Sequence, residues 1–184
     1  MGMFMTKGVL YNTKCYLIGG MENEDGQKWR ETIENFLGYM GIKCLNPYKK
    51  PFVHKIFEDN DARAQLKKWM EDGEYDLVAE RMKKVRNDDL RCCDLVDFSI
   101  CRISPGIQSW GTGEELATLN REKKPIFLVI EGGKKYCPLW IMGMIPHKYI
   151  YNSVEDVLKM IDLINQGQVE IDSERWQLLE WEFR

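Results

Sequence analysis

The stretch Ser109 to Ala117, which reads SWGTGEELA, combines glycines with carboxylates that could take part in a reaction. Gly111 and Gly113 stand directly before two adjacent carboxylates, Glu114 and Glu115. Glycine lets a backbone approach a ligand closely and adopt positive φ, so a glycine-rich turn is typical of a binding site. The chain contains neither the dinucleotide-binding pattern G-x-G-x-x-G nor the P-loop pattern G-x-x-x-x-G-K-[ST].

We expect a helix to begin near Thr112 to Glu115, immediately after these glycines. The start of a helix has free backbone N–H groups and the positive end of the helix dipole, and both favour an anion. A carboxylate in this position stays ionised, as a nucleophile requires. A plainer interpretation stays open, because many helices carry acidic residues in their first turn without any catalytic role.

The rest of the chain alternates between strand-like and helix-like segments. Between residues 25 and 42, apolar side chains recur at helical spacing, at Trp29, Ile33, Phe36, Leu37 and Met40. A later helix is expected at residues 153–167, with Ser153 as its N-cap. Short apolar runs predict strands at residues 14–20, 42–47, 95–103, 125–130 and 148–151. This alternation predicts an α/β fold, a three-layer sandwich with a parallel, roughly five-stranded, flavodoxin-like sheet.

In open parallel sheets, ligands bind beyond the carboxyl ends of the strands, where the strand order reverses. Gly19 and Gly20 follow the first predicted strand, and the segment Ser104 to Glu115 follows the third. We therefore expect both glycine-containing segments to face one crevice.

The 184 residues fit a single domain, 1–184, with two additions. The segment Tyr48 to Lys84 is expected to be irregular chain and then charged helices, interrupted at Gly73. We interpret it as a helical flap over the site, with a dimer contact as the plainer alternative. The tail at about 168–184 contains Trp176, Leu179 and Phe183 at helical spacing, and we expect it to pack on the domain or on a partner subunit.

Composition excludes several classes of function. A net charge of −3 argues against binding to a nucleic acid polymer. No apolar run reaches the roughly 18 residues of a membrane span, and no signal peptide is recognisable, so we expect a soluble cytoplasmic protein without membrane contact. Six cysteines are then expected to be reduced. His54 and His147 have no metal-ligand spacing, which predicts no metal site.

Three motifs together resemble the nucleoside 2-deoxyribosyltransferase family, including its 2'-deoxynucleoside 5'-monophosphate N-glycosidase branch. They are YLIGG at residues 16–20, NDDL at 87–90 and SWGTGEELA at 109–117. Tyr16 and Gly19 match the family's first-strand pattern Y-x-x-G. Asp89 matches the aspartate before the third strand. Glu115 matches the nucleophile in G-x-G-x-E-L-[GA], which leaves Glu114 as its solvent-side neighbour.

The resemblance implies cleavage of an N-glycosidic bond. Glu115 would attack C1' of the sugar and form a glycosyl ester, as in retaining glycosidases. Tyr16 would position that carboxylate, and Asp89 would hold or protonate the leaving base. A second base or water would then accept the deoxyribosyl group, and no cofactor is implied. Family members share residues between subunits, which predicts a homodimer or a higher homo-oligomer.

The sequence leaves open whether the chain is more similar to the nucleoside transferases or to the monophosphate hydrolases. Ser109 resembles the monophosphate hydrolases, because a neutral donor can accept a 5'-phosphate. Two observations oppose that reading: acids stand at Glu22 and Glu24, where the phosphate branch has an arginine, and Met142 stands where a neighbouring subunit lends a polar group.

Two further side chains are candidate contacts for the base. Trp110 could stack on a base or simply pack, and Asn46 could touch the base or belong to a turn. Two other functions also remain: a nucleotide sensor without turnover, and a glycohydrolase of NAD-type molecules.

Overall fold

The computed structural model describes residues 7–20, 25–49, 60–106, 109–172 and 174–176. Within these residues, strands and helices alternate as the sequence predicts. The strands are β1 Lys14–Gly19, β2 Lys43–Leu45, β3 Phe98–Ile103, β4 Ile126–Ile130 and β5 Ile150–Tyr151. The α-helices are α1 Asp25–Tyr39, α2 Asn60–Glu71, α3 Tyr75–Leu95, α4 Trp110–Arg121, α5 Leu139–Met144 and α6 Val154–Asn165. Short 3₁₀ turns lie at Pro47–Lys49, Lys134–Tyr136 and His147–Tyr149.

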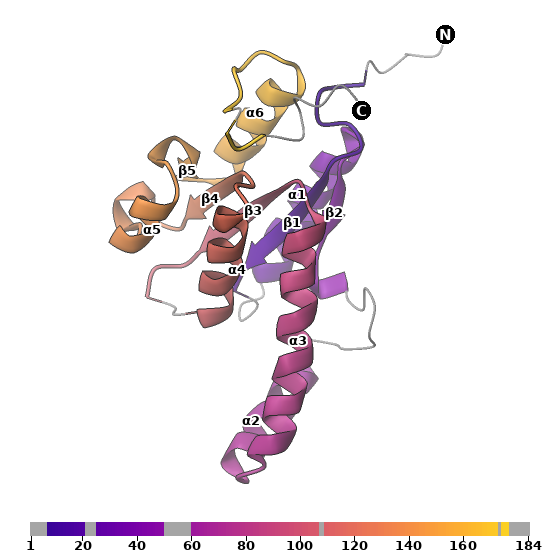
Figure 1. Ribbon diagram of the computed structural model, residues 1–184, viewed down its shortest axis with the longest axis vertical. Helices are drawn as coiled ribbons and strands as arrows, with labels where there is room; N and C mark the ends of the chain where they lie inside the picture. The colour runs from indigo at the N-terminus through magenta and orange to yellow at the C-terminus, as the bar shows by residue number, and fades with distance from the viewer. Residues whose placement is uncertain (1–6, 21–24, 50–59, 107–108, 173, 177–184) are drawn as a thin grey trace.

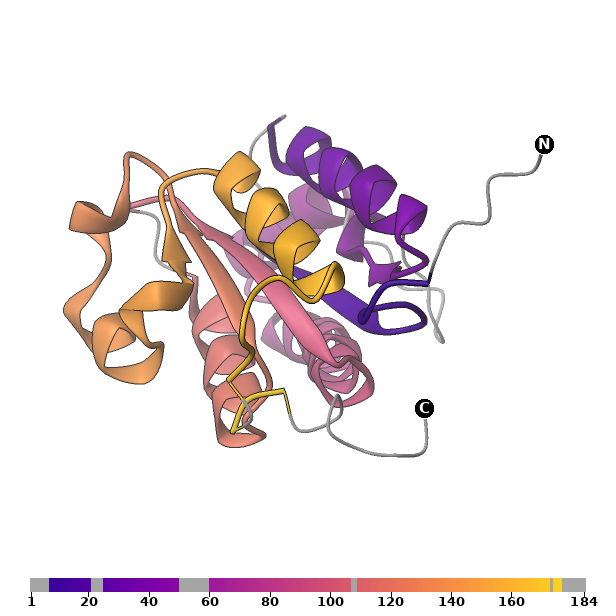
Figure 2. The same ribbon diagram turned by 90° about the horizontal axis from the view of Figure 1, so that it is seen from above.

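The described strands form one parallel sheet in the order β2-β1-β3-β4-β5. Helices α1 and α6 cover one face, and α3 and α4 cover the other, which makes three layers (Figure 2). The predicted α/β sandwich with a flavodoxin-like sheet is thus confirmed. The strand order reverses between β1 and β3, so the carboxyl ends of these two strands mark the expected ligand edge.

The core lies on both faces of β1, β3 and β4. All five residues of β4 are buried, as is typical of a parallel strand covered on both sides. On α1 the predicted stripe packs against the sheet, with Ile33 and Leu37 fully buried. Ser153 caps α6 by accepting a hydrogen bond from the N–H of Asp156 at 3.1 Å. All six cysteines are free thiols.

The segment between β2 and β3 departs furthest from a compact α/β unit. Helices α2 and α3 form a hairpin that projects from the body beyond the end of α4 (Figure 1). Gly73, with φ 78°, lies in the connection between them, as predicted. Helix α3 then continues without interruption into the body, so the predicted insertion boundary at Lys84 lies inside a helix. Whether the hairpin acts as a flap stays a prediction.

The tail after α6 returns to the core. Trp176 is buried, and its ring lies 5.4 Å from that of Phe98 and 5.9 Å from that of Phe127. The tail therefore packs on the domain at this residue. Leu179 and Phe183 lie outside the described residues.

Candidate active site

A tyrosine and two carboxylates meet where β1, α3 and α4 converge. The hydroxyl of Tyr16, on β1, donates to Oε1 of Glu115, on α4, at 2.7 Å. The same hydroxyl oxygen lies 3.0 Å from Oδ1 of Asp89, on α3. Tyr16 is 1% exposed and Glu115 is 8% exposed. Three residues predicted to act together are thus brought into direct contact from three separate elements.

Tyr16 remains a neutral hydrogen-bond donor in this environment. Its pKa is raised well above the ordinary value, first by burial and then by the negative charges of Glu115 and Asp89. A phenol with a raised pKa keeps its proton at neutral pH. Tyr16 can therefore hold a carboxylate by hydrogen bonding but cannot act as a base.

The two adjacent glutamates of α4 point in different directions. Successive helical residues are turned by about 100° from one another. Glu115 points toward β1 and bonds to Tyr16, whereas Glu114 makes a two-point ion pair with Arg86 of α3, with Nε donating to Oε2 at 2.7 Å and Nη2 donating to Oε1. The prediction that Glu115, and not Glu114, is the inward carboxylate agrees with this geometry.

The start of α4 corrects one expectation about the glycines. The helix begins at Trp110, earlier than predicted, because the side chain of Ser109 accepts a hydrogen bond from the N–H of Thr112 at 3.3 Å and caps the helix there. Gly111 and Gly113 therefore lie in the first turn of the helix rather than in a turn before it, and neither has positive φ.

Another reason is needed for these glycines, since each costs about 1 kcal/mol relative to alanine inside a helix. A Cβ added at Gly111 or Gly113 would meet no atom within 4 Å. The space beside both glycines is therefore open, and neither needs a special backbone conformation.

Gly19 and Gly20 differ from one another in how closely other atoms approach them. Gly19 has φ 153°, and a Cβ there would lie 2.6 Å from the carbonyl oxygen of Arg102 on β3. Gly19 is thus required by the close approach of β1 and β3. Around Gly20 an added Cβ would meet nothing within 4 Å, so its position is open.

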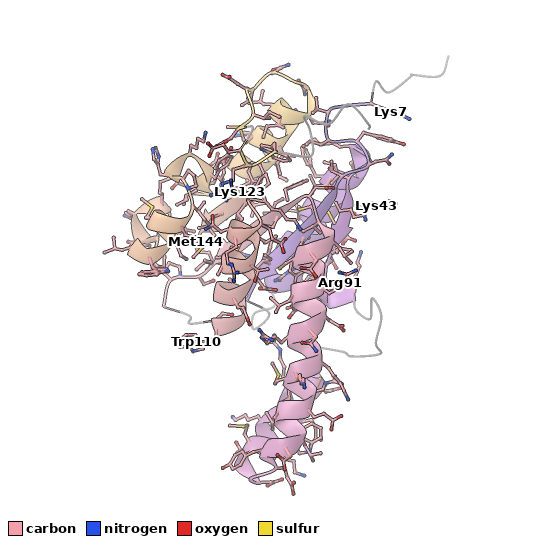
Figure 3. All side chains as sticks on the ribbon, viewed as in Figure 1. Lys7, Lys43, Arg91, Trp110, Lys123 and Met144 are labelled. Carbon is pink, nitrogen blue, oxygen red and sulfur yellow. The ribbon has the colours of Figure 1, made fainter. Side chains whose placement is uncertain are left out.

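A cleft of about 1010 Å³ lies across the carboxyl edge of the sheet, between the start of α4 and α5. Of the predicted residues, Gly20, Ser109, Trp110 and Gly113 line it. Trp110 is 89% exposed and stands at the free end of α4 (Figure 3). Three further tryptophan and methionine side chains contribute to its apolar lining, those of Trp29, Trp140 and Met144.

The cleft reaches the helix turn that carries Glu115 without being lined by the carboxylate pair itself. Glu114 and Leu116, the sequence neighbours of Glu115, line the cleft, and so does Thr112, one turn of α4 before it. The residues lining this cleft do not include Tyr16, Asp89 or Glu115. The cleft and the carboxylate pair both include residues of α4.

The remaining predicted contacts are not brought to the cleft. Gly111 is not part of its lining. The amide of Asn46 is buried and used locally, since its Nδ2 donates to Glu34 at 3.2 Å and its Oδ1 accepts from the N–H of Tyr48 at 3.1 Å. This bonding supports the interpretation of Asn46 as a turn residue. Glu22 and Glu24 lie outside the described residues.

Arg30 is a residue that sequence reasoning missed. Its side chain is fully buried, and its guanidinium lies 4.5 Å from the ring of Trp29 and 5.3 Å from that of Tyr48. Burial lowers its pKa. Its N–H groups donate to four backbone carbonyls, those of Leu17, Gly19, Gly20 and Gly26.

Arg30 thus ties the end of β1 to the first turn of α1 and shapes the segment that carries Gly20. The signal available in the sequence was a single arginine beside Trp29, on the helix that follows the paired glycines. An arginine on a partly polar helix does not by itself indicate burial.

Among the described residues, no group of three or more His, Cys, Asp or Glu side chains is arranged to hold a metal ion. None of the described helices is long and apolar enough to cross a membrane.

The fold and the site define a flavodoxin-like α/β protein with a tyrosine-bridged carboxylate pair near its switch point. The chain shares this fold with a 2-deoxyribosyltransferase from the psychrotolerant bacterium Bacillus psychrosaccharolyticus, with a TM-score of 0.52 and 20% identity over 79% of this chain and 90% of that one. A CMP N-glycosidase from Clostridium botulinum is also similar, with a TM-score of 0.47 and 20% identity over 82% of this chain and 98% of that one. No family model matches the sequence, and no curated protein does.

Proposed function

We propose that this chain cleaves the N-glycosidic bond of 2'-deoxynucleosides or their 5'-monophosphates through a covalent intermediate on Glu115. The deoxyribosyl group would pass to another base or to water. The fold shared with a 2-deoxyribosyltransferase supports this class of reaction. The observation that carries the proposal is the contact of one buried hydroxyl, that of Tyr16, with both Glu115 and Asp89.

The hydrogen count at this contact favours different roles for the two carboxylates. A phenol has one hydrogen to donate. Tyr16 can therefore donate to only one of the two carboxylates at a time, and the shorter distance, 2.7 Å to Glu115 against 3.0 Å to Asp89, favours Glu115 as its acceptor. In the proposal, Glu115 is the carboxylate held for attack, and Asp89 is the group that carries the proton for the base when substrate is bound.

In the first half of the reaction, an oxygen of Glu115 forms a bond to C1' as the bond from C1' to the base nitrogen breaks. The base leaves with that electron pair and takes up a proton, for which Asp89 is the proposed source. The product of this half is a glycosyl ester of Glu115 and a free base. Tyr16 holds the attacking carboxylate in place and keeps its own proton throughout.

In the second half, water or a nitrogen of another base attacks C1', and the ester bond to Glu115 breaks. Asp89, now ionised, accepts the proton that the attacking group loses. Both carboxyl groups return to their starting states, so the cycle balances without an additional reagent. Retention at C1' follows from the two displacements.

The test is to incubate the protein with each deoxynucleoside and each 5'-monophosphate, with and without an acceptor base, and to separate the products by chromatography. Free base without an acceptor indicates hydrolysis, and a new nucleoside that forms only with an acceptor indicates transfer. A mass increase of the protein by one deoxyribosyl group, located at Glu115 by peptide mapping, would identify the intermediate.

The same assay addresses the other two functions. Release of nicotinamide from NAD, with no requirement for a 2'-deoxy sugar, would replace the proposal with an NAD-type glycohydrolase. Tight ligand binding without any free base would indicate a sensor. Full activity in a Glu115→Ala variant would remove Glu115 from the mechanism.

A further inference from the structure

Charged side chains at the cleft are already paired within the protein. Among the described residues, the charged side chains that line it are Arg102, Glu114 and Glu131. Arg102 bonds to Glu131 at 2.5 Å, so the ends of β3 and β4 carry a neutralised pair. A ligand entering this part of the cleft meets no guanidinium without a carboxylate beside it.

Glu114 is neutralised in the same way from the neighbouring helix. Nε and Nη2 of Arg86 bond to the two oxygens of Glu114, which is the two-point geometry that also suits a phosphate. The hydrogen bond to Arg86 lowers the pKa of Glu114, which keeps that carboxylate charged. Arg86 lies one helical turn before Asp89, so this pair stands beside the proposed reaction centre.

Two other side chains that could receive a phosphate are also engaged within the protein. The hydroxyl of Ser109 caps α4 and bonds to Thr112. Arg30 is fully buried, and its hydrogen bonds go to backbone carbonyls. A 5'-phosphate in the cleft would therefore meet the carboxylates of Glu114 and Glu131 before it met an available cation of the described residues.

We propose that the Arg86–Glu114 pair makes the site selective for uncharged 2'-deoxynucleosides over their 5'-monophosphates. This inference rests on the proposed function for the identity of the ligand. Glu114 binds the guanidinium of Arg86, which is not itself part of the cleft lining, and presents a carboxylate rather than a cation to the cleft. Glu114 is thus a specificity-determining residue, and Arg86 is the cation that its removal would release.

The experiment compares binding of a deoxynucleoside and its 5'-monophosphate by titration calorimetry at low ionic strength, where charge effects are least screened. The variants are Glu114→Gln, Arg86→Gln and the double variant. The measured quantity is the ratio of the two dissociation constants, monophosphate over nucleoside. Both side chains are about half exposed, so the substitutions leave the core intact, which circular dichroism checks.

In the wild type we expect the nucleoside to bind more tightly than the monophosphate. Glu114→Gln should lower the ratio about tenfold, because a freed Arg86 gains a charge-assisted bond to the phosphate. Arg86→Gln should raise the ratio, because Glu114 is left unneutralised. In the double variant, the gain made by Glu114→Gln should disappear, because that gain requires Arg86.

The matched control is Glu80→Gln. Glu80 makes an exposed ion pair with Lys84 on the same helix, at 2.6 Å, and does not line the cleft. Its removal should leave the ratio unchanged. A wild type that prefers the monophosphate, or a Glu114→Gln variant with an unchanged ratio, would overturn the inference.

Failure of the proposed function is distinguishable from failure of this inference. If no substrate releases a base but the binding ratios change as expected, the charge selectivity stands and the catalytic role of Glu115 falls. If base is released equally well from both ligands in all variants, the catalytic role stands and the selectivity falls.

Discussion

Glutamate and arginine occur both in the interior of the site and at its rim, but they have different partners in the two places. In the interior, Glu115 bonds to a buried tyrosine and Arg30 bonds to backbone carbonyls. At the rim, Glu114 and Arg86 neutralise one another in partial contact with solvent. A charge buried without solvent is expensive to leave unsatisfied, whereas an exposed pair contributes little to stability. Substitutions in the two regions should therefore differ in size and in kind.

Glu115→Gln is expected to have the largest effect. Loss of the nucleophile should lower kcat by about 10³-fold or more with little change in substrate affinity, because the amide cannot form the ester. The measurement is the rate of base release. Glu114→Gln, the same substitution at the adjacent rim residue, should lose less than about tenfold. Equal losses in the two variants would contradict the distinction between interior and rim.

Arg30→Met is expected to destabilise the fold by about 3 kcal/mol or more. Four carbonyls at the end of β1 and the start of α1 would lose their donor in a buried place. Urea denaturation measures the free energy of unfolding. Arg86→Ala, which removes an exposed guanidinium, should cost less than about 1 kcal/mol.

Tyr16→Phe is expected to lower kcat by about 10²-fold, since it removes the hydrogen bond that holds Glu115 and connects it to Asp89. The ring keeps its place in the core, so the fold should remain. Steady-state kinetics and a thermal melt test both parts. A variant with wild-type kcat would show that the bridge serves packing alone.

Trp110→Ala should act on binding rather than on chemistry. The exposed indole lines the cleft, and loss of stacking on a base should raise KM about five- to tenfold with kcat nearly unchanged. Tyr39→Ala is the matched control, because Tyr39 is an exposed aromatic residue on α1 outside the cleft lining. Equal changes in both variants would remove Trp110 from the ligand site.

The smallest expected effect is a dependence of stability on alkaline pH. The raised pKa of Tyr16 means that the folded phenol keeps its proton while the unfolded one ionises near pH 10. The contribution of Tyr16 to the free energy of unfolding is fully present below about pH 10. Above that pH it is lost by up to about 1.4 kcal/mol per pH unit. Urea denaturation between pH 8 and 11 should show a shallower loss in Tyr16→Phe. Tyr151, whose pKa burial raises to about 12, acts in the same direction and remains in that variant.

Much of the framework could be predicted from local patterns. The apolar stripe of α1, the buried run of β4 and the cap at Ser153 each depend on residues close together in the chain, and all three are confirmed. Helix α4 begins earlier than the glycines suggest, because Ser109 caps it before both of them. Local propensity alone did not reveal that the cap would include both glycines in the helix.

The partners of charged side chains could not be predicted in this way. Arg30 reads as an ordinary polar position on α1, and only the approach of β1 and its following segment turns it into a buried donor to four carbonyls. Arg86 and Glu114 lie on separate helices, so their pairing depends on how α3 and α4 pack. Neither contact has a periodic signal, because each depends on how two elements pack: β1 and α1 for Arg30, and α3 and α4 for the Arg86–Glu114 pair.

By itself, the order of apolar and polar residues determined the alternation of strands and helices, and with it the parallel sheet. The tertiary structure determined that Glu115 is buried against Tyr16, whereas the adjacent Glu114 forms an ion pair with Arg86. The reason is that hydrophobic periodicity is a property of neighbouring residues, whereas the environment of a charge is set by whatever the fold packs against it. Tyr16 and Glu115, for example, are hydrogen-bonded to one another although they lie 99 residues apart in the chain.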